Sequence, residues 1–114
     1  MKKISATENY LARRPIPEEQ IQWSSEQEGL IVLHKENTGF FPLIAQKLFG
    51  RPRISYIHLD EMGSFVWPLM DGKKDIACLG ELVKERFGEQ AEPLYVRLAK
   101  YFQILDSYSL IRWK

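Results

Sequence analysis

Cysteine, long apolar runs, glycine-rich loops and an excess of one charge are all scarce or absent in this sequence. The chain has 114 residues and one cysteine, Cys78, so no internal disulfide can form and a stapled secreted scaffold is excluded. No run approaches the roughly 20 apolar residues that cross a bilayer. No apolar segment follows the initial Met-Lys-Lys as it would in a signal peptide. These absences predict a cytoplasmic protein with no membrane partner.

The charges are nearly balanced, with 16 basic and 15 acidic residues and a net charge of +1. This balance gives no overall attraction to nucleic acid or to anionic lipid, although basic residues could still cluster locally. The glycines are scattered, so no phosphate-binding loop is expected. His34 and His58 lack companion ligands at metal spacing, and Cys78 has no companion base. We therefore expect no catalytic residue, no metal and no cofactor. On this basis the protein is not expected to be an enzyme.

Alternating and β-branched residues predict three strands. Ile21-Gln-Trp23 and Leu30–Leu33, separated by a turn at Glu26–Gly29, are typical of an antiparallel hairpin. Arg53–Leu59 alternates as well, with Ser55, Ile57 and Leu59 on one face and Ile54, Tyr56 and His58 on the other. Between the second and third strands, residues 40–49 have helical spacing and predict a short inserted helix.

Three helices are expected after the strands. Asp60 is placed to cap a short helix that carries Phe65 and Trp67, both predicted to be core residues, and Pro68 should bend it. Asp75 caps a second helix that ends at Gly88. A third helix is expected after Pro93, and residues 109–113 are expected to form a short terminal segment that can be extended. The apolar face expected for the third helix comprises Leu94, Leu98, Tyr101, Phe102, Leu105 and Tyr108.

Residues 1–19 are expected to form an irregular arm, because Arg13-Arg14-Pro15-Ile16-Pro17 cannot continue a helix. Tyr10 and Leu11 are expected to hold this arm against the rest of the protein. Residues 20–114 are then one domain of the α+β class.

Several of these positions resemble the PqqD-like family, whose domain is also called the RiPP recognition element. The resemblance covers about residues 54–111. It rests on a core leucine ending a strand, an aromatic and a tryptophan in the next helix, and Asp-Gly after them. It continues with a capped helix ending in Phe-Gly and a third apolar helix. The matching positions are Leu59, Phe65, Trp67, Asp71-Gly72, Asp75, Ile76, Leu79, Val83, Phe87-Gly88, Leu98, Tyr101, Phe102 and Leu105. Two departures are Ser109, where the family usually has glycine, and the length of the segment before the third strand.

The resemblance implies a winged helix-turn-helix variant, with a three-stranded antiparallel sheet followed by a three-helix bundle. It implies binding rather than catalysis. The family captures the leader of a ribosomally synthesised precursor peptide and presents it to a tailoring enzyme, often a radical S-adenosylmethionine enzyme. The leader adds as a strand beside the third strand and lies against the third helix. On this basis the peptide-binding residues are Arg53, Ile54, Ser55, Tyr56, Ile57, Arg97 and Tyr101.

Three alternatives remain at this stage. The edge of the third strand could be covered by the arm or by the inserted helix. A winged helix could instead bind DNA as a transcriptional regulator, but both candidate reading helices carry mixed charge, which argues against nucleic acid. The protein could also be a purely structural subunit of a maturation enzyme. The residues do not identify the peptide or the oligomeric state. They also do not distinguish PQQ synthesis from another pathway.

Overall fold

The computed structural model describes residues 6–37 and 53–114, and its centre is an antiparallel sheet of three strands. These are β2 (Gln22–Ser25), β3 (Ile31–Asn37) and β4 (Arg53–His58), in the order β2-β3-β4. A 3₁₀ turn, η1 (Gln27–Gly29), joins β2 to β3. The predicted α+β class and three-stranded antiparallel sheet are confirmed. The helix expected at residues 40–49 lies outside the described residues.

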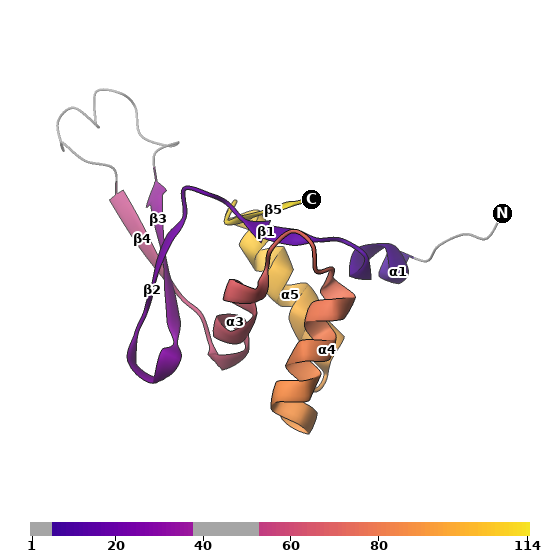
Figure 1. The fold of residues 1–114 in the computed structure, drawn as a ribbon. Helices are drawn as coiled ribbons and strands as arrows, with labels where there is room; N and C mark the ends of the chain where they lie inside the picture. The colour runs from indigo at the N-terminus through magenta and orange to yellow at the C-terminus, as the bar shows by residue number, and fades with distance from the viewer. Residues whose placement is uncertain (1–5, 38–52) are drawn as a thin grey trace.

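The helices after the sheet lie against one of its faces (Figure 1). They are α3 (Glu61–Val66), η2 (Trp67–Leu69), α4 (Ile76–Phe87), η3 (Gly88–Ala91) and α5 (Leu94–Ser107). The predicted caps are confirmed: the Asp60 carboxylate accepts the Gly63 N–H at 2.7 Å, and the Asp75 carboxylate accepts the Cys78 N–H at 2.8 Å. Within the described part of the chain, none of the helices is long and apolar enough to cross a membrane.

The N-terminal segment is more regular than the sequence suggested. It contains α1 (Ala6–Leu11) and β1 (Pro15–Pro17), and β1 pairs with the terminal strand β5 (Ile111–Trp113). Lys114 N–H donates to the Arg14 carbonyl and Glu18 N–H to the Leu110 carbonyl. Because bonded positions alternate in an antiparallel pair, both prolines of β1 fall where no N–H is needed. The prolines that predicted an irregular arm are therefore compatible with a strand.

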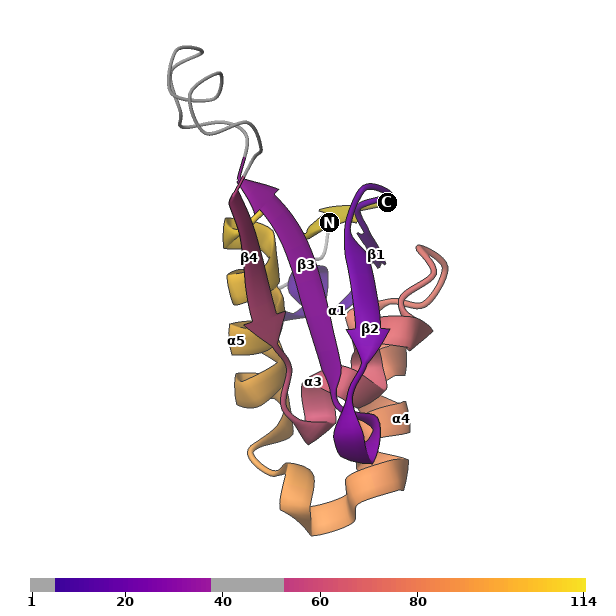
Figure 2. The ribbon, with the colours of Figure 1, turned by 90° about the vertical axis from the view of Figure 1, so that its left-hand side faces the viewer.

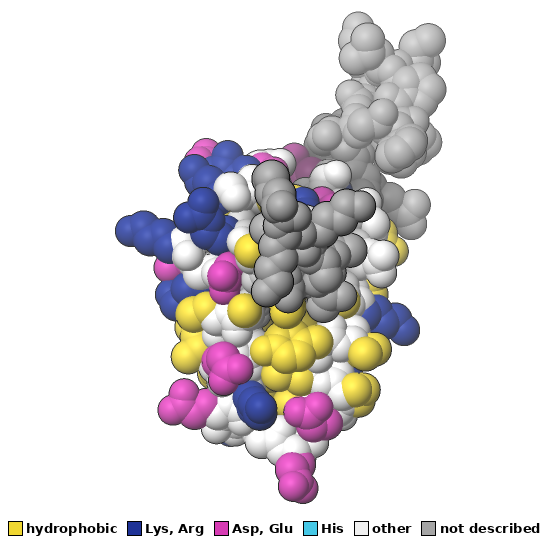
Figure 3. All heavy atoms as spheres, turned by 90° about the vertical axis from the view of Figure 1, so that its right-hand side faces the viewer, with side chains coloured by type: hydrophobic (Ala, Val, Ile, Leu, Met, Phe, Trp, Pro, Cys, Tyr) yellow, Lys and Arg dark blue, Asp and Glu magenta, His cyan; other side chains and the backbone are white. Residues whose placement is uncertain are grey.

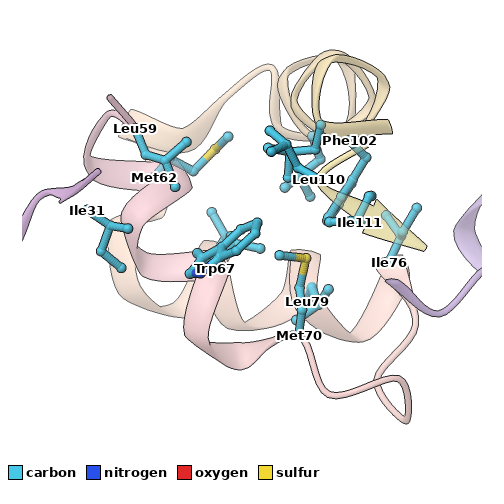
Figure 4. Close-up of a cluster of buried hydrophobic side chains, with 14 of the residues drawn as sticks. Ile31, Leu59, Met62, Trp67, Met70, Ile76, Leu79, Phe102, Leu110 and Ile111 are labelled. Carbon is cyan, nitrogen blue, oxygen red and sulfur yellow. The ribbon is translucent and has the colours of Figure 1, made fainter. Parts of the chain in front are cut away.

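The core lies between the sheet and the helices and surrounds Trp67 (Figure 4). Trp67 is only 1% exposed, as predicted. Phe65 is only half-buried and packs edge-to-face on Phe87 at the margin of the core, with ring centroids 5.6 Å apart. Tyr10 and Leu11 are partly buried and pack against the same core, which confirms that they hold the N-terminal segment in place. Tyr108 is 55% exposed because α5 ends before it.

The end of α5 is a Schellman motif centred on Ser109. Leu110 N–H donates to the Leu105 carbonyl and Ser109 N–H donates to the Asp106 carbonyl, each at 2.9 Å. Leu105 and Leu110 are both buried, which supplies the hydrophobic contact of this motif. Ser109 has a φ of 57°, in the left-handed region. This explains physically why glycine suits the position at which Ser109 stands.

Replacing Ser109 with glycine should therefore stabilise the protein by about 0.5–1 kcal/mol, because the left-handed conformation costs a serine more than a glycine. Urea unfolding of both proteins measures the difference. Ser107→Gly is the matched control: Ser107 is the last residue of α5, and glycine there should lower the stability. An equal loss of stability in both variants would contradict this assignment.

Candidate functional site

The strand β4 forms one edge of the three-stranded sheet, with α5 behind it (Figure 2). Leu59 N–H donates to the Ile31 carbonyl at 2.9 Å, one step beyond the pair Val32–His58. Bonded and non-bonded pairs alternate in an antiparallel ladder. The main-chain groups of Ile57 and Ser55 therefore point inward to β3.

The main-chain N–H and C=O groups of Ile54, Tyr56 and His58 consequently point outward from the sheet. Within residues 6–37 and 53–114, no main-chain hydrogen bond from outside the sheet reaches these groups. The described part of the N-terminal segment does not cover them, because β1 pairs with β5 instead. The inserted segment that could also cover this edge lies outside the described residues.

Side chains of β4 alternate as predicted. Ile54 and Tyr56 are 45% and 59% exposed on the side of the sheet away from the helices, where Tyr56 packs edge-to-face on His34. Ile57 and Ser55 are half-buried on the side that faces the helices. Arg53 pairs with Asn37 at the start of β4, and its side chain lies outside what the structure describes.

A groove of about 380 Å³ runs between the end of β4 and α5, and we call it the β4–α5 groove. It contains three of the predicted site residues, Ile57, Arg97 and Tyr101. Sequence reasoning missed Ile104 as a site residue and considered Lys100 more typical of a solvated surface. Both lie three or seven residues from Arg97 on α5, so helical spacing could have found them. The complete lining is Ile57, His58, Leu59, Asp60, Met62, Arg97, Lys100, Tyr101, Ile104 and Leu105.

The groove combines an apolar surface with an excess of positive charge, since Arg97 and Lys100 outnumber the carboxylate of Asp60 among its lining residues. Ile57, Leu59, Met62 and Leu105 supply aliphatic groups, and Ile104 is 44% exposed beside them. Arg97 and Lys100 lie on the α5 side. Arg97 is half-buried, and its Nη1 donates to the Gln90 carbonyl at 2.9 Å, which holds the guanidinium in place. This surface suits an extended segment with apolar and acidic side chains.

Tyr101 fixes the distance between α5 and α3. Its hydroxyl donates to the Gly63 carbonyl at 2.9 Å, so it points into the protein rather than outward as expected. A Cβ at Gly63 would lie 2.8 Å from the Tyr101 ring, so this approach requires glycine. Burial raises the pKa of Tyr101 above the ordinary tyrosine value, and the negative charge of Asp60 adds to the effect. Tyr101 is therefore a fixed wall of the groove.

A second contact holds the other end of α5 against the sheet. The Lys35 ammonium donates to the Tyr108 carbonyl just beyond the last residue of α5. A cation at this position also interacts favourably with the negative end of the helix dipole. Lys35 is paired with Ser55 across the β3–β4 ladder. α5 is thus held at two points, to α3 through Tyr101 and to β3 through Lys35.

The described residues offer little for other kinds of chemistry. Within them, no three His, Cys, Asp or Glu side chains lie close enough to hold a metal ion, and Cys78 is exposed on α4. The face opposite the sheet carries both signs of charge, with basic side chains gathered toward its upper left and acidic ones toward its lower end (Figure 3). A DNA reader usually concentrates positive charge on one helix face.

The raised pKa of Tyr101 predicts a dependence of stability on pH. An unfolded tyrosine ionises near pH 10, whereas the buried hydroxyl stays protonated. Wild-type stability should therefore be complete below about pH 10 and should fall above it. Tyr101→Phe loses the hydrogen bond, at a cost of about 1 kcal/mol, but also loses this dependence. Urea unfolding from pH 7 to 11 should show the difference between the two proteins narrowing above about pH 10. A difference that stays constant would mean that Tyr101 ionises normally in the folded protein.

Comparison with known proteins agrees with the resemblance found in the sequence. No match is found among curated proteins or among solved structures. The sequence model of the family described as coenzyme PQQ synthesis protein D (PqqD) matches residues 29–111. This range includes β3, β4 and the helices that form the groove. Because the match spans most of the chain, the protein belongs to the PqqD family.

Proposed function

We propose that this protein is a non-catalytic peptide-binding protein that acts in the cytoplasm. It captures the leader of a ribosomally synthesised precursor peptide and presents it to a radical S-adenosylmethionine tailoring enzyme. The observation that carries the proposal is the row of outward main-chain groups on Ile54, Tyr56 and His58, beside a groove walled by α5. Membership of a family named for coenzyme PQQ synthesis supports a role in peptide modification.

Binding would proceed by strand addition. An extended peptide beside β4 forms main-chain hydrogen bonds with the outward N–H and C=O groups. These bonds supply affinity that does not depend on the peptide sequence. Alternate side chains of the peptide then face the β4–α5 groove, where apolar groups and the charges of Arg97 and Lys100 select among sequences. Tyr56 and Ile54 contact the peptide side chains that point away from the groove.

We also propose that the sheet with α3, α4 and α5 is a winged helix-turn-helix variant, with residues 1–19 as an arm.

The two proline substitutions on β4 test this mechanism. Ser55→Pro removes an N–H that points inward to β3, so it should destabilise the fold by about 2–3 kcal/mol. Tyr56→Pro removes an outward N–H, which an edge strand tolerates, so the fold should survive. Calorimetric titration with the precursor peptide encoded beside this gene should then show at least a tenfold loss of affinity for Tyr56→Pro, about 1.4 kcal/mol.

Tyr56→Ala is the matched control, because it removes the side chain and keeps the main-chain N–H. It should retain most of the affinity, and circular dichroism should show both Tyr56 variants folded. Unchanged affinity in a folded Tyr56→Pro protein would show that the peptide does not add to this edge. Submicromolar binding of duplex DNA at physiological salt would instead favour a regulator.

A further inference from the structure

The β4–α5 groove continues past Arg97 into a second pocket, which we call the end pocket. Arg97, Asp60 and Met62 line both cavities, so the two share a wall. The end pocket has a volume of about 260 Å³ and lies where the start of α3 meets η3. Its remaining lining residues are Glu61, Phe87, Gln90 and Ala91. A peptide that follows β4 beyond Leu59 reaches this pocket next.

The chemistry of the end pocket differs from that of the groove. Met62, Phe87 and Ala91 give it apolar walls, and Asp60 and Glu61 are the acids among its lining residues. One oxygen of the Asp60 carboxylate is occupied by the Gly63 N–H at 2.7 Å. The Glu61 carboxylate is exposed and forms no ion pair among the described residues. The guanidinium of Arg97 is bonded to the Gln90 carbonyl.

We propose that the end pocket is a specificity subsite for a lysine or arginine side chain of the bound peptide. This proposal rests on the proposed function and adds a second requirement to the sequence that is bound. A long aliphatic stem fits against Met62 and Phe87, while its cationic head reaches Glu61. Asp60 and Glu61 outnumber Arg97, the one cation among the lining residues, so an acidic side chain would meet a net negative charge. A purely apolar side chain would desolvate the carboxylates without a partner.

Together the two cavities would select a peptide that carries side chains of opposite charge at two positions. Arg97 and Lys100 in the groove favour an acidic peptide side chain, and Glu61 in the end pocket favours a basic one. Both neighbouring pairs in this sheet are antiparallel. An antiparallel peptide would place its N-terminal end beside the end of β4. The basic residue is therefore expected N-terminal to the strand-forming residues of the peptide.

Selection from a displayed library of random 12-residue peptides tests this pattern without knowledge of the natural peptide. The full chain is used as wild type and as Glu61→Lys, Arg97→Glu and Tyr56→Pro. Glu85→Lys is the matched control, because Glu85 is exposed on α4 and belongs to neither cavity lining. Wild type and Glu85→Lys should enrich a basic residue N-terminal to an acidic and apolar core. Glu61→Lys should keep that core and lose the basic preference, whereas Arg97→Glu should lose the acidic one.

A charge exchange measured by fluorescence anisotropy completes the test. Changing the basic residue of a selected peptide to glutamate should weaken binding to wild type about tenfold and restore binding to Glu61→Lys. The end-pocket proposal is overturned if Glu61→Lys selects peptides with the same basic preference, or if wild type shows no basic preference. Either result leaves the strand-addition proposal standing. Peptides that bind Tyr56→Pro as well as wild type overturn the strand-addition proposal, and the end-pocket proposal falls with it.

Discussion

The hydrogen bond from the Leu59 N–H to the Ile31 carbonyl fixes the register of β4 against β3, and the candidate site depends on that register. It turns the main-chain groups of Ser55 and Ile57 toward β3 and those of Ile54, Tyr56 and His58 away from β3, toward the outer edge of the sheet. A slip of one residue would reverse both the exposed groups and the buried side chains. Ile57 and Leu59, which pack against the core from this side of the sheet, oppose such a slip because they would have to leave the core.

The groove needs a constant distance between this edge and α5. Tyr101 holds α5 to α3 through the Gly63 carbonyl, and Lys35 holds the end of α5 to β3, the strand next to this edge, through the Tyr108 carbonyl. Behind the groove, Leu98 and Phe102 are buried in the core that surrounds Trp67. A cavity whose walls are already ordered loses little conformational freedom when a peptide binds. In the proposed complex, this core would therefore contribute to binding without contacting the peptide.

Much of this arrangement could be predicted from the sequence because it follows local patterns. The alternation of β4, the caps at Asp60 and Asp75 and the burial of Trp67 all rest on short-range spacing. The pairing of β1 with β5 could not be predicted, because it joins residues about a hundred positions apart. It also places prolines at positions where no N–H is needed. The direction of the Tyr101 hydroxyl also escaped prediction, because it depends on the absence of a side chain at Gly63, on another helix.

Amide hydrogen exchange along β4 tests the central claim most directly. In the free protein, the amides of Ser55 and Ile57 should exchange slowly because they pair with β3, whereas those of Ile54, Tyr56 and His58 should exchange rapidly. Addition of the precursor peptide should slow exchange at the second set and leave the first set unchanged. Slow exchange at Ile54, Tyr56 and His58 in the free protein, or no change on binding, would contradict an open edge that captures a peptide.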